Sequence, residues 1–158
     1  MGDYTRSIEM FNESIKIKEI VKKYEDREIN IDLEKNLKIN MRLNSFKRCL
    51  INLIDNGLSY GKSVEIFAKK TTNSIIILVD DNGPGIPEKE YKNVMKPFYR
   101  IDKSRGQNKS GVGLGLSIAN DIIRSHGGNI SLEKSHLNGL RVKISLPCLL
   151  YTSDAADE

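Results

Sequence analysis

Apolar and polar positions repeat along the chain with two different periods, which predict helices and strands in a mixed order. Three segments have the apolar spacing of a helix with one buried face: residues 12–24, 44–60 and 113–126. Six others alternate or form β-branched runs, as strands do: residues 28–33, 37–41, 64–68, 74–79, 129–133 and 140–146. This order predicts an α+β fold in which helices cover one face of a sheet.

The short turns between these segments predict which strands pair. Residues 28–33 and 37–41 are predicted to form one hairpin, residues 64–68 and 74–79 a second, and the last two strands close the sheet around Asn138-Gly139. In the first helix the residues expected to face the core are Ile15, Ile20, Val21 and Tyr24. In the second helix they are Phe46, Leu50, Leu53, Ile54 and Leu58.

Length and composition indicate one domain with a core of its own. The chain has 158 residues, of which 39% are hydrophobic and 29% charged, and a net charge of +4. We find no run of 18 apolar residues and no secretory signal, and therefore expect no contact with a membrane. Cys49 and Cys148 lack the spacing of a metal site or a disulfide, which fits a reducing cytoplasm.

A glycine-rich segment, Gly111-Val-Gly113-Leu-Gly115-Leu116, leads into the third predicted helix. The first N–H groups of a helix have no partner within it and its dipole favours negative charge there, while glycines let phosphate oxygens approach the backbone. The segment is therefore a candidate phosphate site. A flexible glycine loop without a ligand is the alternative. No Gly-Lys-Ser/Thr follows, so the segment is not a Walker A loop.

A carboxylate beside a glycine turn follows the predicted strand 74–79. Asp81 precedes Asn82-Gly83-Pro84-Gly85-Ile86, where turn residues end the strand. A carboxylate in a pocket of bare backbone can accept a hydrogen bond from the exocyclic amine of adenine, and Ile86 is a candidate apolar wall for the ring. The alternative is an Asx-type turn in which Asp80 or Asp81 caps its own backbone.

The second predicted helix carries two amides on a face that differs from its apolar stripe. Asn52, Asn56 and Tyr60 recur every four residues and therefore share that face. Amide oxygens are hard ligands that suit Mg²⁺, which takes its other ligands from water and phosphates. Asn56 is the candidate metal ligand, and a pair of solvated asparagines on a surface helix is the alternative.

Four segments taken together resemble a known family. Residues 52–60, Asp81-Asn-Gly83-Pro-Gly85, Lys96-Pro-Phe98-Tyr99-Arg100 and residues 111–116 are similar to the N, G1, F and G2 boxes of the sensor histidine kinase catalytic domain. That domain belongs to a superfamily with gyrase, the Hsp90 chaperones and the mismatch-repair ATPases. The similarity covers residues 10–147, and residues 47–61 look closest to osmosensor-type kinases, which pair with a winged-helix response regulator.

The resemblance implies the Bergerat fold, a two-layer α/β sandwich with a mixed, mostly antiparallel sheet and about three helices on one face. It implies that ATP binds between the helices and a mobile lid, with adenine on Asp81, Mg²⁺ on Asn56 and support for the metal site from Asn52. The other ATP-binding residues that it implies are Ser59, Tyr60, Gly83, Gly85, Ile86, Phe98, Tyr99, Arg100, Arg105, Gly111, Val112, Gly113, Leu114, Gly115 and Leu116. Tyr60 and Arg100 would approach phosphate.

The sequence departs from this family at two positions, and the expected lid is strongly basic. Ser59 stands where these kinases usually carry Lys or Arg, and Gly57 replaces a usual Ala. Residues 91–110 carry six Lys or Arg side chains and a single acidic one, which places positive charge between the adenine and phosphate motifs. A nucleic-acid surface is the competing explanation, but few aromatics are interleaved and no recognition motif is present, so no nucleic-acid partner is expected.

The residue four positions before Asn56 indicates the phosphoryl acceptor. Superfamily members that hydrolyse ATP or phosphorylate serine resemble one another in carrying Glu there, as a base for water or a hydroxyl. Here the residue is Asn52, and an amide cannot act as a general base. A neutral imidazole already has an available lone pair, so transfer to histidine is favoured.

The acceptor is expected on another part of the protein. The chain has two histidines, His126 and His136, and neither lies in a His-Glu/Asp-x-x-x-Pro context. We therefore expect residues 11–147 to be a cytoplasmic catalytic domain of a kinase anchored in the inner membrane. Residues 1–10 would end a linker from a histidine-bearing dimerisation domain, residues 148–158 would be a disordered or non-native tail, and a cognate response regulator would be a further partner. The alternatives are a serine kinase or ATPase of the superfamily and, because of Ser59, a nucleotide-sensing module without catalysis.

Overall fold

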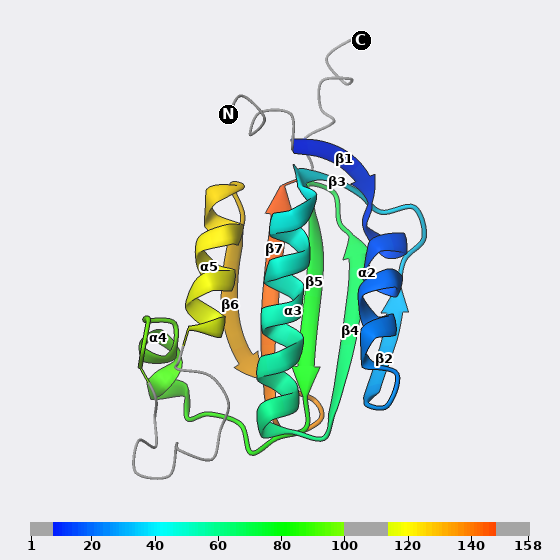
Figure 1. The fold of residues 1–158 in the computed structure, drawn as a ribbon. Coiled ribbons are helices and arrows are strands. Elements are labelled where there is room, and N and C mark those ends of the chain that lie inside the picture. The colour runs from blue at the N-terminus through cyan, green and yellow to red at the C-terminus, as the bar shows by residue number, and fades with distance from the viewer. Residues whose placement is uncertain (1–7, 100–113, 148–158) are drawn as a thin grey trace.

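A computed structural model describes residues 8–99 and 114–147 (Figure 1). The elements, in chain order, are β1 (Ile8–Asn12), α2 (Glu13–Val21), η1 (Lys22–Tyr24), β2 (Glu28–Leu33), β3 (Lys38–Arg42), α3 (Leu43–Tyr60), β4 (Ser63–Lys70), β5 (Ser74–Asp81), η2 (Glu88–Glu90), α4 (Tyr91–Val94), α5 (Gly115–Ser125), β6 (Asn129–Lys134) and β7 (Leu140–Pro147). The expected tail at 148–158 and the part of the expected lid from residue 100 to residue 110 lie outside the described residues.

The main sheet has five strands in the order β2-β4-β5-β7-β6. The pair β2–β4 is parallel, and the pairs β4–β5, β5–β7 and β6–β7 are antiparallel. The mixed, mostly antiparallel sheet is confirmed, and so are the two hairpins predicted for residues 64–79 and 129–146. Both hairpins join strands through short turns, which is the pairing that a local sequence pattern predicts best.

The predicted hairpin between residues 28–33 and 37–41 is wrong. β3 pairs antiparallel with β1 in a separate two-stranded sheet, while β2 pairs with β4. A backbone hydrogen bond from Glu34 N to the Ala68 carbonyl (3.0 Å) continues the contact with β4 beyond the end of β2. Alternation reports which face of a strand is buried but not which strand lies beside it. β1 itself was not predicted, and it begins inside the expected linker at residues 1–10.

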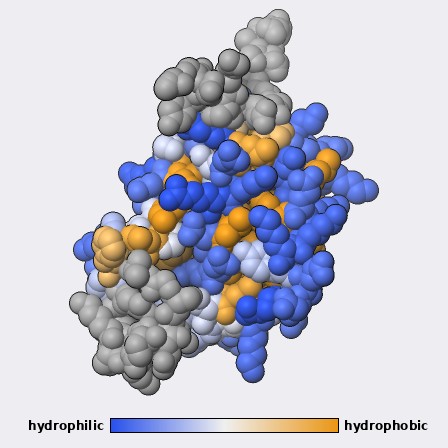
Figure 2. Space-filling model, viewed as in Figure 1, coloured by the Kyte–Doolittle hydropathy of each residue, from blue (hydrophilic) through white to orange (hydrophobic). Residues whose placement is uncertain are grey.

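Helices α2, α3 and α5 lie side by side on one face of the five-stranded sheet, as expected (Figure 1). The core fills the space between these layers with side chains that alternate along the strands: Val64, Ile66 and Ala68 of β4, Ile75, Ile77 and Val79 of β5, and Val142, Ile144 and Leu146 of β7. The outer surface of the helical layer is mostly hydrophilic, with separate hydrophobic patches (Figure 2). Within the described ranges, the structure contains no helix with the length and hydropathy needed to span a bilayer.

Helix α3 packs as its pattern predicted, and the first helix does so at every expected core residue except Ile15. All five residues of the predicted α3 stripe are buried. Ile20 is buried, and Val21 and Tyr24 are partly buried against the core, as expected. Ile17 is buried as well, whereas Ile15 is 52% exposed, so its expected place in the core is wrong. The Asn12 side chain accepts a hydrogen bond from Ile15 N (3.1 Å) and so caps the helix. This cap places Ile15 in the first turn, on the outer side.

Glu13, the first residue of α2, is buried in the core without a partner. The residue has no exposed surface, and neither carboxyl oxygen has a hydrogen-bond partner among the described residues. Burial raises the pKa of Glu13 to about 8. The carboxyl group is therefore neutral in the folded domain at neutral pH, because ionisation without a partner in an apolar surrounding is costly.

We expect the free energy of unfolding to fall between about pH 5 and about pH 8 because of Glu13. Over this range the unfolded chain loses the Glu13 proton near its ordinary pKa of 4.5, whereas the folded domain keeps it up to about 8. Ionisation therefore favours the unfolded state, by at most ~1.4 kcal/mol per pH unit, and the full cost is reached above pH 8. Urea unfolding at several pH values measures this slope.

The control is a second glutamate on the same helix. Glu13→Gln removes the ionisation and should flatten the slope, so that the variant is more stable than the wild type near pH 8. Glu19→Gln changes a half-exposed side chain of α2 and should keep the wild-type slope. Identical pH dependence in all three proteins would show that Glu13 is not buried as described.

Candidate functional site

Asp81 lies at the end of β5 with its carboxylate turned toward α3. Its Oδ1 atom accepts hydrogen bonds from Gly83 N (2.8 Å) and from Leu140 N (3.2 Å). No described residue donates to its Oδ2 atom, which keeps its capacity to accept. Burial raises the pKa of Asp81 above its ordinary value, although the two backbone N–H groups oppose that shift. One oxygen thus holds the group in place, and the other lies on the side of Gly57 of α3.

Three glycines bring the backbone close to Asp81. A methyl group at Gly139 would overlap the Oδ1 and backbone oxygen atoms of Asp81. One at Gly83 would lie 2.7 Å from the Tyr60 carbonyl oxygen, and one at Gly57 would lie 3.3 Å from Asp81 Cβ. A side chain at any of these positions would force its neighbours to move. Glycine therefore lets the end of β5, the β6–β7 turn and α3 meet around one carboxylate.

Asn82, next to Asp81, fixes the turn after α3 to the turn after β5. Its Oδ1 atom accepts hydrogen bonds from Lys62 N (2.7 Å) and Ser63 N (3.0 Å). Gly85 follows with φ at +79°, in the region that glycine adopts readily. Ile86 is partly buried against the core, where it can provide the apolar wall expected of it. The segment from Asp81 to Ile86 is therefore held at both ends.

Helix α3 presents its amide-bearing face toward the start of α5. The Asn52 side chain donates through Nδ2 to the Arg48 carbonyl (2.8 Å), which leaves its Oδ1 atom available. A methyl group added to Gly115 would meet Asn52 O at 3.6 Å and Asn52 Oδ1 at 3.8 Å, so the two helices touch here. Asn56 lies one turn further along α3 and is half-buried, and Ser59 and Tyr60 complete the last turn.

Helix α5 begins beside Asn52 with free backbone donors. The helix starts at Gly115, and no side chain caps it. Ile118 N donates to the carbonyl of Leu114, the residue just before the helix (2.9 Å). The N–H groups of Gly115 and Leu116 therefore have no acceptor within the helix. Anions bind at such a helix start. The expected phosphate-binding residues Gly111, Val112 and Gly113 lie outside the described residues.

The F-box residues lie beyond α4. Phe98 is 68% exposed and has φ at +67°. Tyr99 donates its hydroxyl hydrogen to Glu90 (2.6 Å), so this group is engaged with η2. The structure does not bring Phe98 or Tyr99 into contact with Asp81. Their roles in ATP binding stay predictions, as do those of Arg100 and Arg105, which lie outside the described residues.

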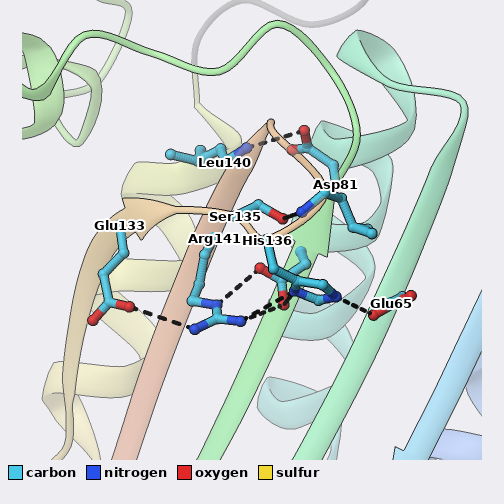
Figure 3. A network of polar contacts seen from close by, with 9 residues as sticks. Glu65, Asp81, Glu133, Ser135, His136, Leu140 and Arg141 are labelled. Atoms are coloured by element: carbon cyan, nitrogen blue, oxygen red, sulfur yellow. Dashed lines mark hydrogen bonds and ion pairs between the residues drawn. The ribbon is translucent and has the colours of Figure 1, made fainter.

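Neither histidine stands as a free phosphoacceptor. His126 ends α5, where its Nδ1 atom lies 2.8 Å from the Ile122 carbonyl and its Nε2 atom 3.4 Å from Arg42 N. His136 lies in the β6–β7 turn, with Nε2 3.0 Å from Glu65 Oε1 (Figure 3). Both imidazoles are engaged in contacts between elements, and an acceptor histidine elsewhere in the protein stays a prediction.

Two residues that surround Asp81 were not identified as site residues from the sequence. Leu140 donates to the carboxylate and Gly139 packs against it, yet both belong to the hairpin that Asn138-Gly139 predicted for structural reasons alone. The positive φ of Asn138 (78°) confirms the turn. The signal in the sequence that could have identified them was this turn. The antiparallel pairing of β5 with β7 places the start of β7, just after the turn, beside the end of β5.

Known proteins resemble this chain in sequence and in fold. Residues 41–149 match the family described as histidine kinase-, DNA gyrase B- and HSP90-like ATPase. The sensor histidine kinase GtrS of Pseudomonas aeruginosa is 41% identical over 105 residues, which cover 66% of this chain and 21% of that protein. The kinase ArlS of Staphylococcus aureus is 37% identical over 123 residues, which cover 75% and 27%. The chain thus spans about a quarter of the length of these relatives.

The fold leads to the same group of proteins. The structure matches the nucleotide-free catalytic domain of histidine kinase ThkA with a TM-score of 0.76 and 26% identity, over 89% of this chain and 95% of that one. The family match covers more than half of the chain and includes α3, β5 and α5, which carry the site. The chain therefore belongs to the histidine kinase-, DNA gyrase B- and HSP90-like ATPase family, and within it is similar to the catalytic domains of histidine kinases.

Proposed function

We propose that this domain binds Mg²⁺ and ATP between α3, the end of β5 and the start of α5, and transfers the γ-phosphoryl group to a histidine of a separate dimerisation domain. The observation that carries the proposal is the Asp81 carboxylate. Two backbone N–H groups hold its Oδ1 atom, while Oδ2 has no donor among the described residues. The exocyclic amine of adenine is a donor of the right kind for Oδ2, and a buried carboxylate gains most from such a donor.

The amides of α3 fit a magnesium ion that is shared with phosphate. Among residues 8–99 and 114–147, no three acidic, His or Cys side chains gather in a way that could hold a metal. Mg²⁺ bound by one or two protein oxygens completes its shell with water and phosphate oxygens. Asn56 would be the ligand and Asn52, with its Oδ1 toward Gly115, would support it. When bound, the ion neutralises charge on the transferred phosphoryl group.

The side chains near the phosphate site favour histidine as the acceptor. The Asn52 amide cannot accept a proton, so it cannot activate water or a serine hydroxyl. An attacking imidazole brings its own lone pair. The role of the domain in the reaction is then to orient ATP through Asp81 and to hold the phosphates at the start of α5. This is catalysis by positioning and by charge stabilisation.

The relatives suggest how the domain is used. GtrS is a sensor histidine kinase and ArlS a signal transduction histidine-protein kinase, and this chain corresponds to about a quarter of their length. We infer that a dimerisation domain and a response regulator are its partners and that it works in the cytoplasm as part of a membrane-anchored kinase. The finer similarity to osmosensor-type kinases stays a prediction. A serine kinase or ATPase, and a nucleotide-sensing module, are the alternatives that the experiments below separate.

Asp81→Asn should weaken ATP binding by roughly 10- to 100-fold, because the neutral amide offers a weaker acceptor and can turn its NH₂ group toward the adenine amine. Isothermal titration of the domain with ATP and Mg²⁺ measures the change. Asp121→Asn removes a carboxylate from the exposed side of α5 and should bind ATP as the wild type does. Wild-type affinity in Asp81→Asn would reject Asp81 as the adenine-binding residue.

Asn56→Ala should remove most of the affinity that ATP gains from Mg²⁺, by at least about 10-fold, because the metal loses its protein ligand. ATP is titrated with Mg²⁺ and again with EDTA, and the two dissociation constants are compared for each variant. Asn44→Ala takes an amide from the first turn of the same helix and is the matched control. The assignment fails if Asn56→Ala shows the same gain from Mg²⁺ as the control.

Phosphoryl transfer is tested with ATP labelled in the γ-phosphate and the dimerisation domain of the parent kinase. We expect label on that domain as phosphohistidine, which is stable in alkali and lost in acid, and weaker labelling by the Asp81→Asn variant at the same ATP concentration. Label that survives acid would indicate a serine kinase, and release of phosphate without the acceptor domain an ATPase. Binding of ATP with no transfer at all would support a sensing module. Each of these three results would contradict the proposed reaction.

A further inference from the structure

The position of the Asp81 carboxylate depends on the turn between β6 and β7. Leu140 N donates to its Oδ1 atom (3.2 Å), and Gly139 packs so closely that no side chain fits between them. The turn is internally braced, since Ser135 N donates to the Gly139 carbonyl (2.9 Å) and Leu137 N to Ser135 Oγ (2.9 Å). A shift of this turn would carry the Leu140 donor away from Asp81.

The opposite face of the sheet anchors the same turn through Asp80. Consecutive side chains of a strand point to opposite faces, so Asp80 points away from α3 while Asp81 points toward it. Asp80 is 2% exposed although no helix of the described residues covers that face. Arg141 covers it: Nε lies 2.9 Å from Asp80 Oδ1 and Nη2 3.3 Å from Oδ2. This two-pronged ion pair fixes β7 immediately after Leu140.

His136 provides a second anchor, from within the turn. Its Nε2 atom lies 3.0 Å from Glu65 Oε1 on β4, and its Nδ1 atom 3.3 Å from Arg141 Nη2 (Figure 3). One tautomer satisfies both ring nitrogens: Nε2–H donates to Glu65 while Nδ1 accepts from Arg141. Glu133 on β6 approaches the other side of the guanidinium, 3.7 Å from Nη1. The register places Glu65, Asp80, Arg141 and Glu133 in one row across four strands.

We propose that Arg141 and His136 are positioning residues for adenine recognition, which hold the β6–β7 turn so that Leu140 keeps the Asp81 carboxylate in its binding orientation. This inference rests on the proposed role of Asp81. The two anchors bracket the contact: His136 lies before Gly139 and Leu140 in the chain, and Arg141 directly after them. Neither residue touches the nucleotide, because both lie on the face of the sheet away from α3.

The physical consequence concerns selectivity for the base more than affinity for phosphate. Without Arg141, the buried Asp80 carboxylate loses its ion-pair partner and must reach water, which displaces the start of β7. Asp81 then loses one of its two N–H donors, and its Oδ2 atom no longer points at a fixed place. The phosphate contacts at α5 and Asn56 lie on other elements and are unaffected.

The experiment compares ATP with inosine triphosphate, which carries a carbonyl oxygen where ATP carries the 6-amino group. Dissociation constants for both nucleotides with Mg²⁺ are measured on the full chain by isothermal titration. We expect the wild type to prefer ATP by at least about 10-fold. Arg141→Met and His136→Ala should each reduce this preference by about 3- to 10-fold, chiefly through weaker ATP binding. Lys143→Met removes a cation from the same strand and face and should keep the wild-type preference.

Each result decides a separate claim. If Asp81→Asn keeps the wild-type preference for ATP, the proposed role of Asp81 is wrong. If Asp81→Asn loses the preference while Arg141→Met and His136→Ala retain it, the positioning role is wrong and that of Asp81 stands. Equal weakening of both nucleotides would indicate a purely structural role and also overturns the inference. Should Arg141→Met fail to fold, His136→Ala decides, because its side chain is 55% exposed and its loss leaves the core intact.

Discussion

Consecutive residues of a β-strand point to opposite faces, and at the end of β5 this constraint places two carboxylates back to back. Asp81 points toward α3, where backbone N–H groups and glycines surround it. Asp80 points to the other face, where it pairs with Arg141. Because the two residues share one stretch of backbone, the contacts of one limit the movement of the other. The strand end thus joins a binding site on one face of the sheet to an ion-pair network on the other.

The parts of the fold that depend on local signals were predicted from the sequence, and the parts that depend on distant pairing were not. Short turns predicted both antiparallel hairpins of the main sheet, and the apolar stripe of α3 was predicted residue by residue. The pairing of β3 with β1 joins strands about 30 residues apart, for which alternation gives no partner. Ile15 lies in the first turn of α2, next to the Asn12 cap and on the outer side, which its apolar type alone does not reveal.

The candidate site shows the same division. Asp81, Asn52 and the start of α5 were predicted from turn, amide and glycine patterns, and the structure brings their elements together. The contributions of Gly139 and Leu140 could not be read from their types, because a glycine and a backbone N–H in a hairpin have no distinctive chemistry. They matter because the sheet order places β7 beside β5, which only the assembled sheet shows.

A crystal structure of the domain with Mg²⁺ and a non-hydrolysable ATP analogue tests the account most directly. The account predicts that the 6-amino group of adenine lies within hydrogen-bond distance of Asp81 Oδ2, at about 3 Å, while Leu140 N still donates to Oδ1. The phosphates should lie between the amide face of α3 and the first turn of α5. A purine bound elsewhere, or an Asp81 carboxylate without contact to the base, would contradict it.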